Sequence, residues 1–284
     1  MQTPFFSKKY RSPISIMFLT LATVLLYTSC NTDETQTVTT FTNLTYEDNF
    51  DSDGSINTAF WNYDLGDGTA NGLPAGWGNN ELQYYTDRPE NIKVEGGMLH
   101  ITARRESFQG AAFTSARITT KGKVEQAYGR FEARIQLPWG QGIWPAFWLL
   151  GSNIDEVSWP QCGEIDIMEY RGQKPSTLVG TVHGPGYSGG QAVGKEYILP
   201  NDRFDRGFHI FGIEWGPKYI NFYVDDVLYN QITPEDVPGE WVYDQPFYIL
   251  LNLAVGGNFV GPPNANTVFP QTMLVDYVRV YQKK

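Results

Sequence analysis

The segment "YGRFEARIQLP" (residues 128–138) alternates apolar and charged or polar side chains over its whole length. Phe131, Ala133, Ile135 and Leu137 alternate with Arg130, Glu132, Arg134 and Gln136. In a β-strand, successive side chains point to opposite faces, so this alternation is typical of a strand with one buried face. The segment predicts a half-buried strand.

The same period returns along the chain from residue 44 onward, between short stretches rich in Gly, Pro, Asn and Asp. Further strands are predicted in "MLHITARRE" (98–106), "FHIFGIEW" (208–215), "YINFYVDDVLYNQI" (219–232), "FYILLNLAV" (247–255) and "MLVDYVRVYQ" (273–282). Asp225 and Asp226 interrupt the third of these and indicate a hairpin turn. No stretch has a helical period, so the fold class is all-β: many short antiparallel strands in a sandwich or jelly roll.

Composition limits the possible partners. The 284 residues are 15% aromatic and 18% charged, which is enough apolar material for one large domain. The formal net charge is -10, whereas nucleic-acid-binding proteins usually carry a basic surface. We therefore expect no nucleic-acid partner and a neutral ligand.

The N-terminal residues have the pattern of an export signal. Basic residues at 8–11 precede an apolar run at 14–27, and Thr28 and Ser29 precede Cys30. The run is short for a membrane span. A Cys after small residues at the end of such a run resembles the lipobox of bacterial lipoproteins, in which that Cys is lipidated. The alternative is an ordinary cleaved signal peptide in which Cys30 has no role.

These signals predict three parts of the chain: a lipoprotein signal peptide at 1–29, a flexible tether at 30–42 that begins with the lipidated Cys30, and a folded domain at 43–284. The tether is polar and without periodicity. Once 1–29 are removed, Cys162 is the only cysteine besides Cys30, so the domain has no internal disulfide.

The expected location follows from the anchor. The protein would be exported and lipid-anchored to the outer membrane, with that anchor as its only membrane contact. Asp33 and Glu34 lie soon after Cys30 and resemble surface-export signals of some lipoproteins, which favours the cell surface. We expect a monomer.

The segment "GEIDIMEY" (163–170) carries three carboxylates whose spacing does not fit a regular strand. Glu164 and Asp166 share one face, but regular pairing would turn Glu169 into the core. A buried, unpaired carboxylate costs several kcal/mol, so the regular register is unfavourable. A β-bulge at Met168 adds one residue and returns Glu169 to the acidic face.

Three carboxylates on one face suggest acid–base chemistry. Neighbours on a strand face lie about 6.5 Å apart, so at least one pKa should be raised. Retaining glycoside hydrolysis needs one ionised and one protonated carboxyl about 5 to 5.5 Å apart. The side chains of Glu164 and Glu169 could bend toward each other above Asp166, so that their carboxyl groups reach that distance. The alternative is a solvated acidic strand face.

Three tryptophans lie close to this strand in the sequence. Trp144 and Trp148 precede it closely, and Trp159 lies just before it. Each could be an ordinary core residue, but flat apolar rings also stack on the C–H faces of sugars. Their position around an acidic strand, with Gly and Pro nearby, favours a glycan-binding groove.

The combined motifs resemble glycoside hydrolase family 16, in its laminarinase-like branch. "GEIDIMEY" is similar to the E-x-D-x-x-E signature of that family, and the similarity continues in "WGNNELQYYTDRPENIKVEGGMLHITARRE", "GRFEARIQLPWGQGIWPAFWLLG", "TVHGPGYSGG", "FGIEW", "LNLAVGG" and "VDYVRVYQ". The resemblance implies that 43–284 form a catalytic domain, a jelly-roll sandwich of two curved antiparallel sheets with a concave substrate cleft.

The resemblance also implies roles for the carboxylates. Glu164 would be the nucleophile that forms a glycosyl-enzyme, and Glu169 the acid that protonates the leaving oxygen and later activates water. Asp166 would hydrogen bond to the nucleophile and tune its proton affinity. The spacing with the extra Met168 is the form that this branch carries. No cofactor is needed for catalysis.

The resemblance also implies further substrate contacts. Trp144 and Trp148 would line the subsites on the non-reducing side, where Asn79 and Arg117 would reach sugar hydroxyls. His183 would lie beside the acid on the leaving-group side, and Trp159 is a third candidate platform. Both Arg117 and His183 have a structural alternative. Arg117 could be a surface cation on a strand, and His183 could be a polar residue whose hydrogen bonds are satisfied within the protein.

The family often binds a structural Ca²⁺ on the convex face. Glu47, the backbone of Gly97 and Asp276 stand where its ligands would fall, and all three offer oxygen donors. "DSDGS" at Asp51 is not an EF-hand loop, because its Gly comes at the fourth position, and it predicts a turn.

The leading hypothesis is a lipid-anchored, retaining endo-β-glucanase (an endo-1,3(4)-β-glucanase) that cleaves β-1,3-glucan (laminarin), mixed-linkage β-1,3-1,4-glucan or both. A non-catalytic glycan-binding surface lipoprotein is the alternative from another class, although binding alone gains nothing from crowded carboxylates. A third possibility is the same mechanism on agar, carrageenan or xyloglucan. A sulfated polymer would favour a basic cleft, which this acidic chain does not predict.

Overall fold

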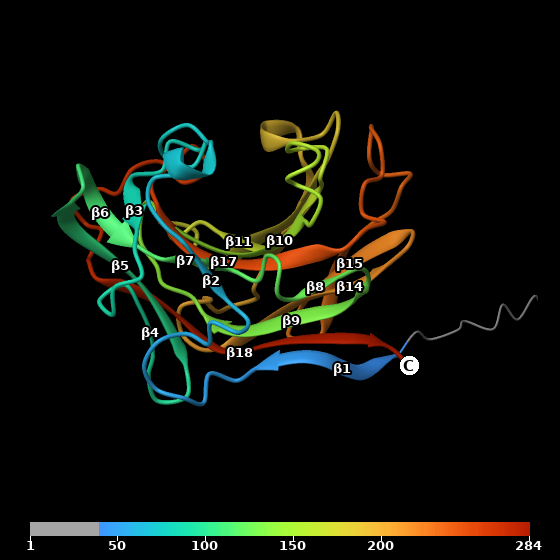
Figure 1. Cartoon of the computed structure of the whole chain (residues 1–284), viewed down its shortest axis with the longest axis horizontal. Coiled ribbons are helices and arrows are strands. Elements are labelled where there is room, and N and C mark those ends of the chain that lie inside the picture. The colour runs from blue at the N-terminus through green and yellow to red at the C-terminus, as the bar shows by residue number, and fades with distance from the viewer. Residues whose placement is uncertain (1–39) are drawn as a thin grey trace, which may run out of the picture. The chain divides into compact units, whose positions relative to one another are not determined.

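The computed structural model describes residues 40–284, and these consist almost entirely of strands. They form two sheets, one of ten strands and one of eight, and the two short 3-10 helices are η1 (Thr69–Asn71) and η2 (Gly189–Gln191). In Figure 1 the eight-stranded sheet lies over the ten-stranded sheet. The all-β prediction is confirmed.

The ten-stranded sheet has the order β16-β15-β14-β9-β18-β5-β6-β3, with β1 and β4 paired to β18 and β5. Its strands are β1 (Phe41–Asp48), β3 (Gln83–Tyr85), β4 (Ile92–Val94), β5 (Leu99–Phe108), β6 (Ala111–Ser115), β9 (Gly129–Gln136), β14 (His209–Gly216), β15 (Tyr219–Val224), β16 (Val227–Ile232) and β18 (Gln271–Lys283). All of its pairs are antiparallel except β3 with β6.

The eight-stranded sheet has the order β13-β12-β11-β10-β17-β7-β2, with β8 paired to β17. Its strands are β2 (Asn62–Asp64), β7 (Arg117–Thr119), β8 (Glu125–Gln126), β10 (Ile143–Gly151), β11 (Glu164–Tyr170), β12 (Thr177–His183), β13 (Val193–Ile198) and β17 (Phe247–Val255). All the predicted strands are present, and Asp225 and Asp226 make the β15–β16 turn with φ values of 49° and 61°.

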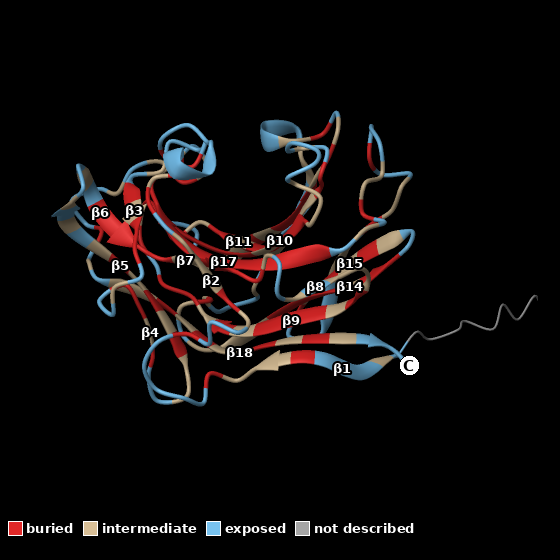
Figure 2. Cartoon of the chain, viewed as in Figure 1, coloured by how far each residue is buried: buried red, intermediate tan, exposed pale blue. Residues whose placement is uncertain are grey.

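The core lies between the two sheets (Figure 2). On β9 the predicted apolar residues Phe131, Ala133 and Ile135 are buried in it. Every residue of β17 is buried, because this central strand packs on the core with one face and is covered by side chains on the other. That double burial explains why "FYILLNLAV" reads as a continuous apolar run.

The folded domain begins slightly earlier than predicted. β1 starts at Phe41, where residues 30–42 were expected to be tether, because Phe41 pairs with Lys283 of β18. The predicted signal peptide at 1–29 and the lipidation at Cys30 lie outside the described residues. Within 40–284, no helix is long and apolar enough to cross a membrane.

Several loops rise above the outer face of the eight-stranded sheet (Figure 1). One of them contains η1 and leads into β3, and another follows β12 and contains η2. The carboxylate strand β11 and its neighbours β10 and β17 run in the sheet below them.

Candidate active site

β11 carries the predicted bulge. Asp166 pairs with Thr181 and Glu169 pairs with Val179, so Ile167 and Met168 together oppose the single residue Gly180 of β12. Ile167 is 1% exposed and Met168 is fully buried, because both side chains enter the core. The extra residue keeps Glu169 on the same face as Glu164 and Asp166, and the predicted register repair is confirmed.

His183 lies beside two of the carboxylates. Its Nε2 is 3.0 Å from Oδ2 of Asp166 and 3.6 Å from Oε1 of Glu164. The backbone N–H of Gly189, in η2, donates to Nδ1 at 3.0 Å and thereby fixes the ring orientation. Strand register pairs His183 directly with Glu164, and its charge also bears on the pKa of the predicted neighbour Glu169.

Glu169 has a different neighbour. The indole Nε1 of Trp144 on β10 donates to Oε1 of Glu169 at 3.1 Å. Between Trp144 and Trp148 on the same strand lies Ala146, whose Cα pairs with Glu169 on one side and Asn252 on the other.

These surroundings change the pKa values of Glu164 and Glu169 to different extents. Burial, followed by the charge of Asp166, raises the pKa of Glu164 to about 7 and raises the pKa of Glu169 well above its usual value. Burial lowers the pKa of His183, but the charge of Glu164 and the contact with Asp166 outweigh it and raise that pKa to about 10. Groups that interact this strongly titrate as one set. The set favours a state in which Glu169 keeps a proton and Glu164 can lose one.

Arg117 and Trp148 lie side by side. The guanidinium carbon of Arg117 is 4.9 Å from the ring centre of Trp148 and 4.4 Å from that of Trp77. Its Nε donates to Oδ2 of Asp64 at 2.9 Å. Trp148 in turn donates from Nε1 to Oδ1 of Asn252 at 2.8 Å. The structure therefore brings the predicted pair together and adds three residues that were not predicted.

Asn79 is exposed and donates from Nδ2 to Oε1 of Glu81 at 3.3 Å. Burial raises the pKa of Glu81, which also accepts a 2.6 Å hydrogen bond from Gln83. On the other side, Trp159 is 42% exposed and its ring centre lies 5.9 Å from that of His183. All the predicted substrate residues thus lie near the carboxylates or near the Arg117–Trp148 pair.

Four polar or aromatic residues of this region escaped the sequence reasoning: Asp64, Trp77, Glu81 and Asn252. Trp77 and Glu81 lie within the quoted motif "WGNNELQ", but this motif has no alternation that would predict which way their side chains face. Asn252 is the one polar residue in the apolar run of β17, and that irregularity was the available signal.

Within residues 40–284, one group of side chains could hold a metal ion by proximity: Glu164, Asp166 and His183, whose ligand atoms lie within 4.8 Å of one another. A metal would need an unprotonated Nε2 on His183. The N–H that Gly189 directs at Nδ1 makes that nitrogen an acceptor, which leaves the ring proton on Nε2. The group fits proton handling better than metal binding.

The predicted calcium ligands lie on or near neighbouring strands of the other sheet, but each carboxylate is paired with an arginine. Oε1 of Glu47 accepts from Arg279 at 2.7 Å, and Oδ2 of Asp276 accepts from Arg134 at 2.7 Å. Gly97 lies in the β4–β5 turn with a φ of 73°. The donor types fit Ca²⁺, whereas the two ion pairs compete with it.

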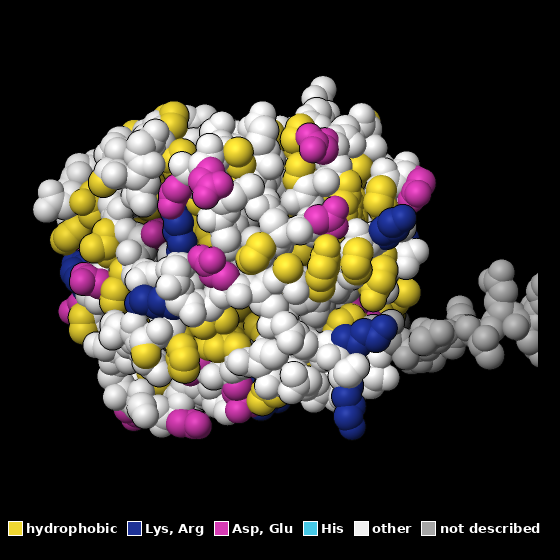
Figure 3. Space-filling view, turned by 45° about the vertical axis from the view of Figure 1, so that its right-hand side comes forward, with side chains coloured by type: hydrophobic (Ala, Val, Ile, Leu, Met, Phe, Trp, Pro, Cys, Tyr) yellow, Lys and Arg dark blue, Asp and Glu magenta, His cyan; other side chains and the backbone are white. Residues whose placement is uncertain are grey.

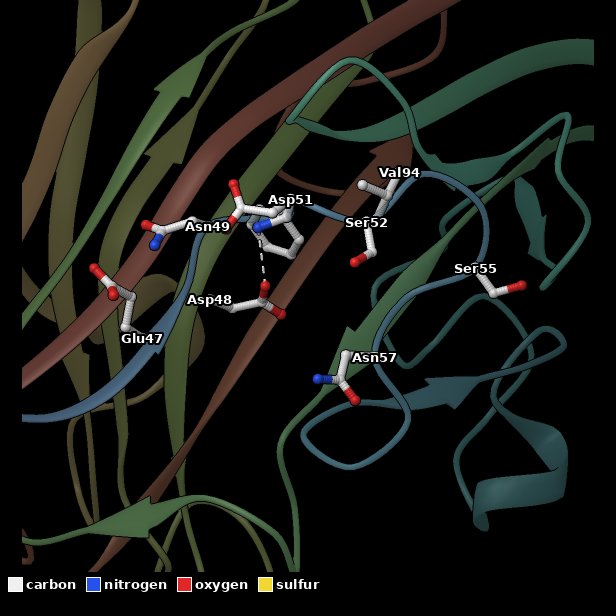
Figure 4. Close-up of a pocket in the computed structure, with 9 residues that line it drawn as sticks. Glu47, Asp48, Asn49, Asp51, Ser52, Ser55, Asn57 and Val94 are labelled. Carbon is white, nitrogen blue, oxygen red and sulfur yellow. Dashed lines mark hydrogen bonds between the residues drawn. The ribbon is translucent and has the colours of Figure 1, made fainter.

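Glu47 also borders a polar hollow of about 390 Å³ (Figure 4). Asp48, Asn49 and Asp51 line the same hollow, and Asp48 accepts hydrogen bonds from the backbone of Phe50 and from Trp61. The hollow lies beside β1, in the ten-stranded sheet, and contains none of the carboxylates of β11.

Known proteins are similar to this chain over most of its length. The family described as "Glycosyl hydrolases family 16" matches residues 79–278. The "Beta-glucanase" of Rhodothermus marinus is 43% identical over an alignment of 251 residues, and the match covers 84% of this chain and 85% of that protein. The "Glucan endo-1,3-beta-glucosidase A1" of Niallia circulans is 38% identical, and the match covers 85% of this chain but 38% of that longer protein.

A solved structure agrees with the sequence matches. The laminarinase catalytic domain of Thermotoga maritima superimposes with a TM-score of 0.81 at 49% identity, covering 85% of this chain and 98% of that domain. The agreement confirms the predicted jelly-roll sandwich. The bulged acidic strand, the fold and these matches lead to one conclusion: the chain is a glycoside hydrolase and belongs to glycosyl hydrolase family 16.

Proposed function

We propose that the chain is a retaining endo-β-glucanase acting on β-1,3-glucan, on mixed-linkage β-1,3-1,4-glucan, or on both. The observation that carries the proposal is the unequal setting of two carboxyls on one bulged strand: Glu169 accepts a hydrogen bond from Trp144, and Glu164 lies against His183. The names of the similar proteins, a β-glucanase, a glucan endo-1,3-β-glucosidase and a laminarinase, support the substrate class.

In the first step, the ionised carboxylate of Glu164 attacks the anomeric carbon while Glu169 donates its proton to the leaving glycosidic oxygen. A covalent glycosyl ester forms on Glu164, and the glycosidic C–O bond breaks. In the second step, Glu169, now ionised, takes a proton from water, and the oxygen of that water displaces Glu164. Two inversions retain the β-configuration.

Asp166 and His183 support the nucleophile in this scheme. His183 favours the ionised form of Glu164, because its Nε2 lies 3.6 Å from Oε1 of that carboxylate, and the same nitrogen lies 3.0 Å from Oδ2 of Asp166. Asp166 acts in the opposite sense by its own charge, which raises the pKa of both glutamates. The balance keeps Glu169 protonated while Glu164 can ionise near neutral pH.

A product profile tests the substrate class. We expect the chain to release short β-1,3 oligosaccharides from laminarin, or mixed-linkage tri- and tetrasaccharides from cereal glucan, with β-configured reducing ends at early times. Products are separated by chromatography and their anomeric form is read by proton NMR. Binding of both polymers without cleavage would favour the glycan-binding alternative, and cleavage of agar or xyloglucan alone would contradict the β-glucanase assignment.

Asp166→Asn should move the pH profile of kcat/KM to lower pH. Removal of the Asp166 charge makes both Glu164 and Glu169 easier to ionise. The acid limb, which requires ionised Glu164, then begins lower, and the basic limb, which requires protonated Glu169, ends lower. We expect a shift of about one pH unit in both limbs.

Laminarin hydrolysis at a series of pH values measures this shift. Asp202→Asn is a matched control, since its side chain is 53% exposed and contacts Arg206 rather than the carboxylates. A displacement toward higher pH, or a slower rate with unchanged limbs, would contradict the assigned role of Asp166.

We also propose a structural Ca²⁺ site at Glu47, Asp276 and the carbonyl of Gly97. In support, all three are oxygen donors, and the two carboxylates lie on the paired strands β1 and β18. Binding would compete with Arg279 and Arg134 for the carboxylates. Calcium should therefore raise the unfolding temperature of the wild-type chain but not that of Glu47→Gln, and an equal response of both would argue against the site.

For the N-terminal part, we propose a signal peptide at 1–29 and a lipid on Cys30 that anchors a monomeric enzyme at the outer membrane, facing outward. The sequence of this segment supports the proposal. Cys30→Ser should release the protein from the membrane fraction. Protease added to intact cells should digest the wild-type protein, and protection from protease would contradict display at the surface.

A further inference from the structure

Five side chains beside the carboxylates form a closed ring of contacts, which we call the Arg117 ring: Trp77, Arg117, Trp148, Asn252 and Tyr85. The guanidinium carbon of Arg117 lies 4.4 Å from the ring centre of Trp77 and 4.9 Å from that of Trp148. Trp148 donates to Asn252 at 2.8 Å, and Asn252 donates to the hydroxyl of Tyr85 at 3.3 Å. The ring closes where Tyr85 packs on Trp77, with 5.4 Å between ring centres.

The contacts leave the guanidinium of Arg117 little freedom. Two indoles lie within 5 Å of its central carbon and restrict its movement. The 2.9 Å hydrogen bond from Nε to Asp64 adds a directional contact that fixes its orientation further. Among residues 40–284, Asp64 is the only hydrogen-bond acceptor for Arg117, and 13% of the side chain stays exposed. Both terminal nitrogens of Arg117 are therefore available to a ligand in one fixed orientation.

Trp77 stands in this ring at a cost in backbone energy. Its φ is 56°, in the left-handed region that bulky residues rarely adopt. The chain around it holds this conformation: the backbone N–H of Trp77 donates to Asp67, and its indole donates to the carbonyl of Gly66. A Cβ on Gly68 would lie 3.0 Å from the Cα of Trp77, so this glycine permits the close approach. Such outliers persist where the surrounding structure over-determines them, often at ligand sites.

We propose that Trp77 is a positioning residue of the glucan site, which presses the guanidinium of Arg117 flat against Trp148 and so presents its terminal nitrogens to the hydroxyls of one glucose unit. The inference rests on the proposed glucanase function. Because the orientation exists before substrate arrives, binding does not have to order a long, flexible side chain. Loss of Trp77 should therefore weaken substrate binding rather than slow the chemical steps at Glu164 and Glu169.

Kinetics of the full chain on laminarin test the proposal with three variants. Trp77→Leu removes the aromatic face and should raise KM about tenfold while kcat stays within about twofold of wild type. Trp77→Phe keeps an aromatic face and should recover most of the lost affinity. Trp139→Leu is the matched control: Trp139 also stacks on an arginine, 5.1 Å from Arg203, and is 48% exposed, but it touches no member of the Arg117 ring.

A fourth variant covers the case in which Trp77→Leu does not fold. Asp64→Asn leaves both indoles in place and weakens only the Nε contact, and it should also raise KM with little change in kcat. An unchanged KM in Asp64→Asn would overturn the inference. So would a folded Trp77→Leu whose KM is unchanged and whose apparent kcat falls only because a smaller fraction of the enzyme is active. No hydrolysis by the wild-type chain would instead contradict the glucanase function, so the two failures are distinguishable.

Discussion

Glu164→Gln is expected to lower kcat on laminarin by about 10⁴-fold or more, because an amide cannot form the glycosyl ester of the first step. Glutamine has nearly the same shape, so the packing of β11 should survive. The buried carboxylate, whose pKa is raised to about 7, is replaced by a group that needs no ionisation. Hydrolysis rates, with circular dichroism as a check on folding, measure the effect.

Azide distinguishes the nucleophile from any other essential carboxylate. In Glu164→Ala, azide can enter the vacated space and attack the anomeric carbon of a β-glucoside that carries a good leaving group. One displacement inverts the centre, so the product should be an α-glycosyl azide. Asp202→Asn, at the exposed position used above, controls for charge loss and should hydrolyse laminarin normally. A β-glycosyl azide from Glu164→Ala would refute the assignment.

Glu169→Ala is expected to produce the second largest loss, about 10² to 10⁴-fold on laminarin, because no group remains to protonate the leaving oxygen. A substrate with a nitrophenolate leaving group needs no such proton, so its first step should stay fast. The glycosyl-enzyme on Glu164 should then accumulate, since the base for the second step is also missing. Mass spectrometry of the quenched reaction detects that species.

The same variant predicts a change in pH dependence and in azide chemistry. The basic limb of the profile should disappear with the nitrophenyl substrate, because that limb reports loss of the proton from Glu169. Azide should attack the glycosyl-enzyme and give a β-glycosyl azide, the product of two inversions. Trp144→Phe is a useful companion, since it removes only the 3.1 Å hydrogen bond to Glu169 and should shift the basic limb upward rather than abolish it.

An unaltered basic limb in Glu169→Ala would indicate that another group supplies the proton. Equal losses on laminarin and on the nitrophenyl substrate would likewise contradict the acid role, because the two substrates differ in their need for protonation.

Much of this protein could be predicted from local pattern. The alternation in "YGRFEARIQLP" predicted a half-buried strand because side chains of a strand alternate between core and solvent, and β9 has that burial except at Glu132, which is 7% exposed. The parity of "EIDIME" predicted the bulge because the alternative would have buried a bare carboxylate, and the register of β11 against β12 contains it. Both predictions rest on energies that neighbouring residues in the sequence already determine.

Contacts between strands that are far apart in sequence could not be predicted in this way. The pairing register of β11 and β12 makes Glu164 the direct partner of His183, a detail that the sequence did not predict. The sequence did not predict partners for the two carboxylates named as calcium ligands, but strand pairing places Arg279 next to Glu47 and Arg134 next to Asp276.

The Arg117 ring is a second feature that local sequence pattern could not predict, this time in the substrate site. The sequence by itself determined an all-β chain with three carboxylates on one bulged strand, since strand period and the cost of burying charge act over a few residues. Only the tertiary structure decided that Trp77, Tyr85, Arg117, Trp148 and Asn252 meet, because their stacking and hydrogen bonds exist only once β3, β7, β10 and β17 have come together.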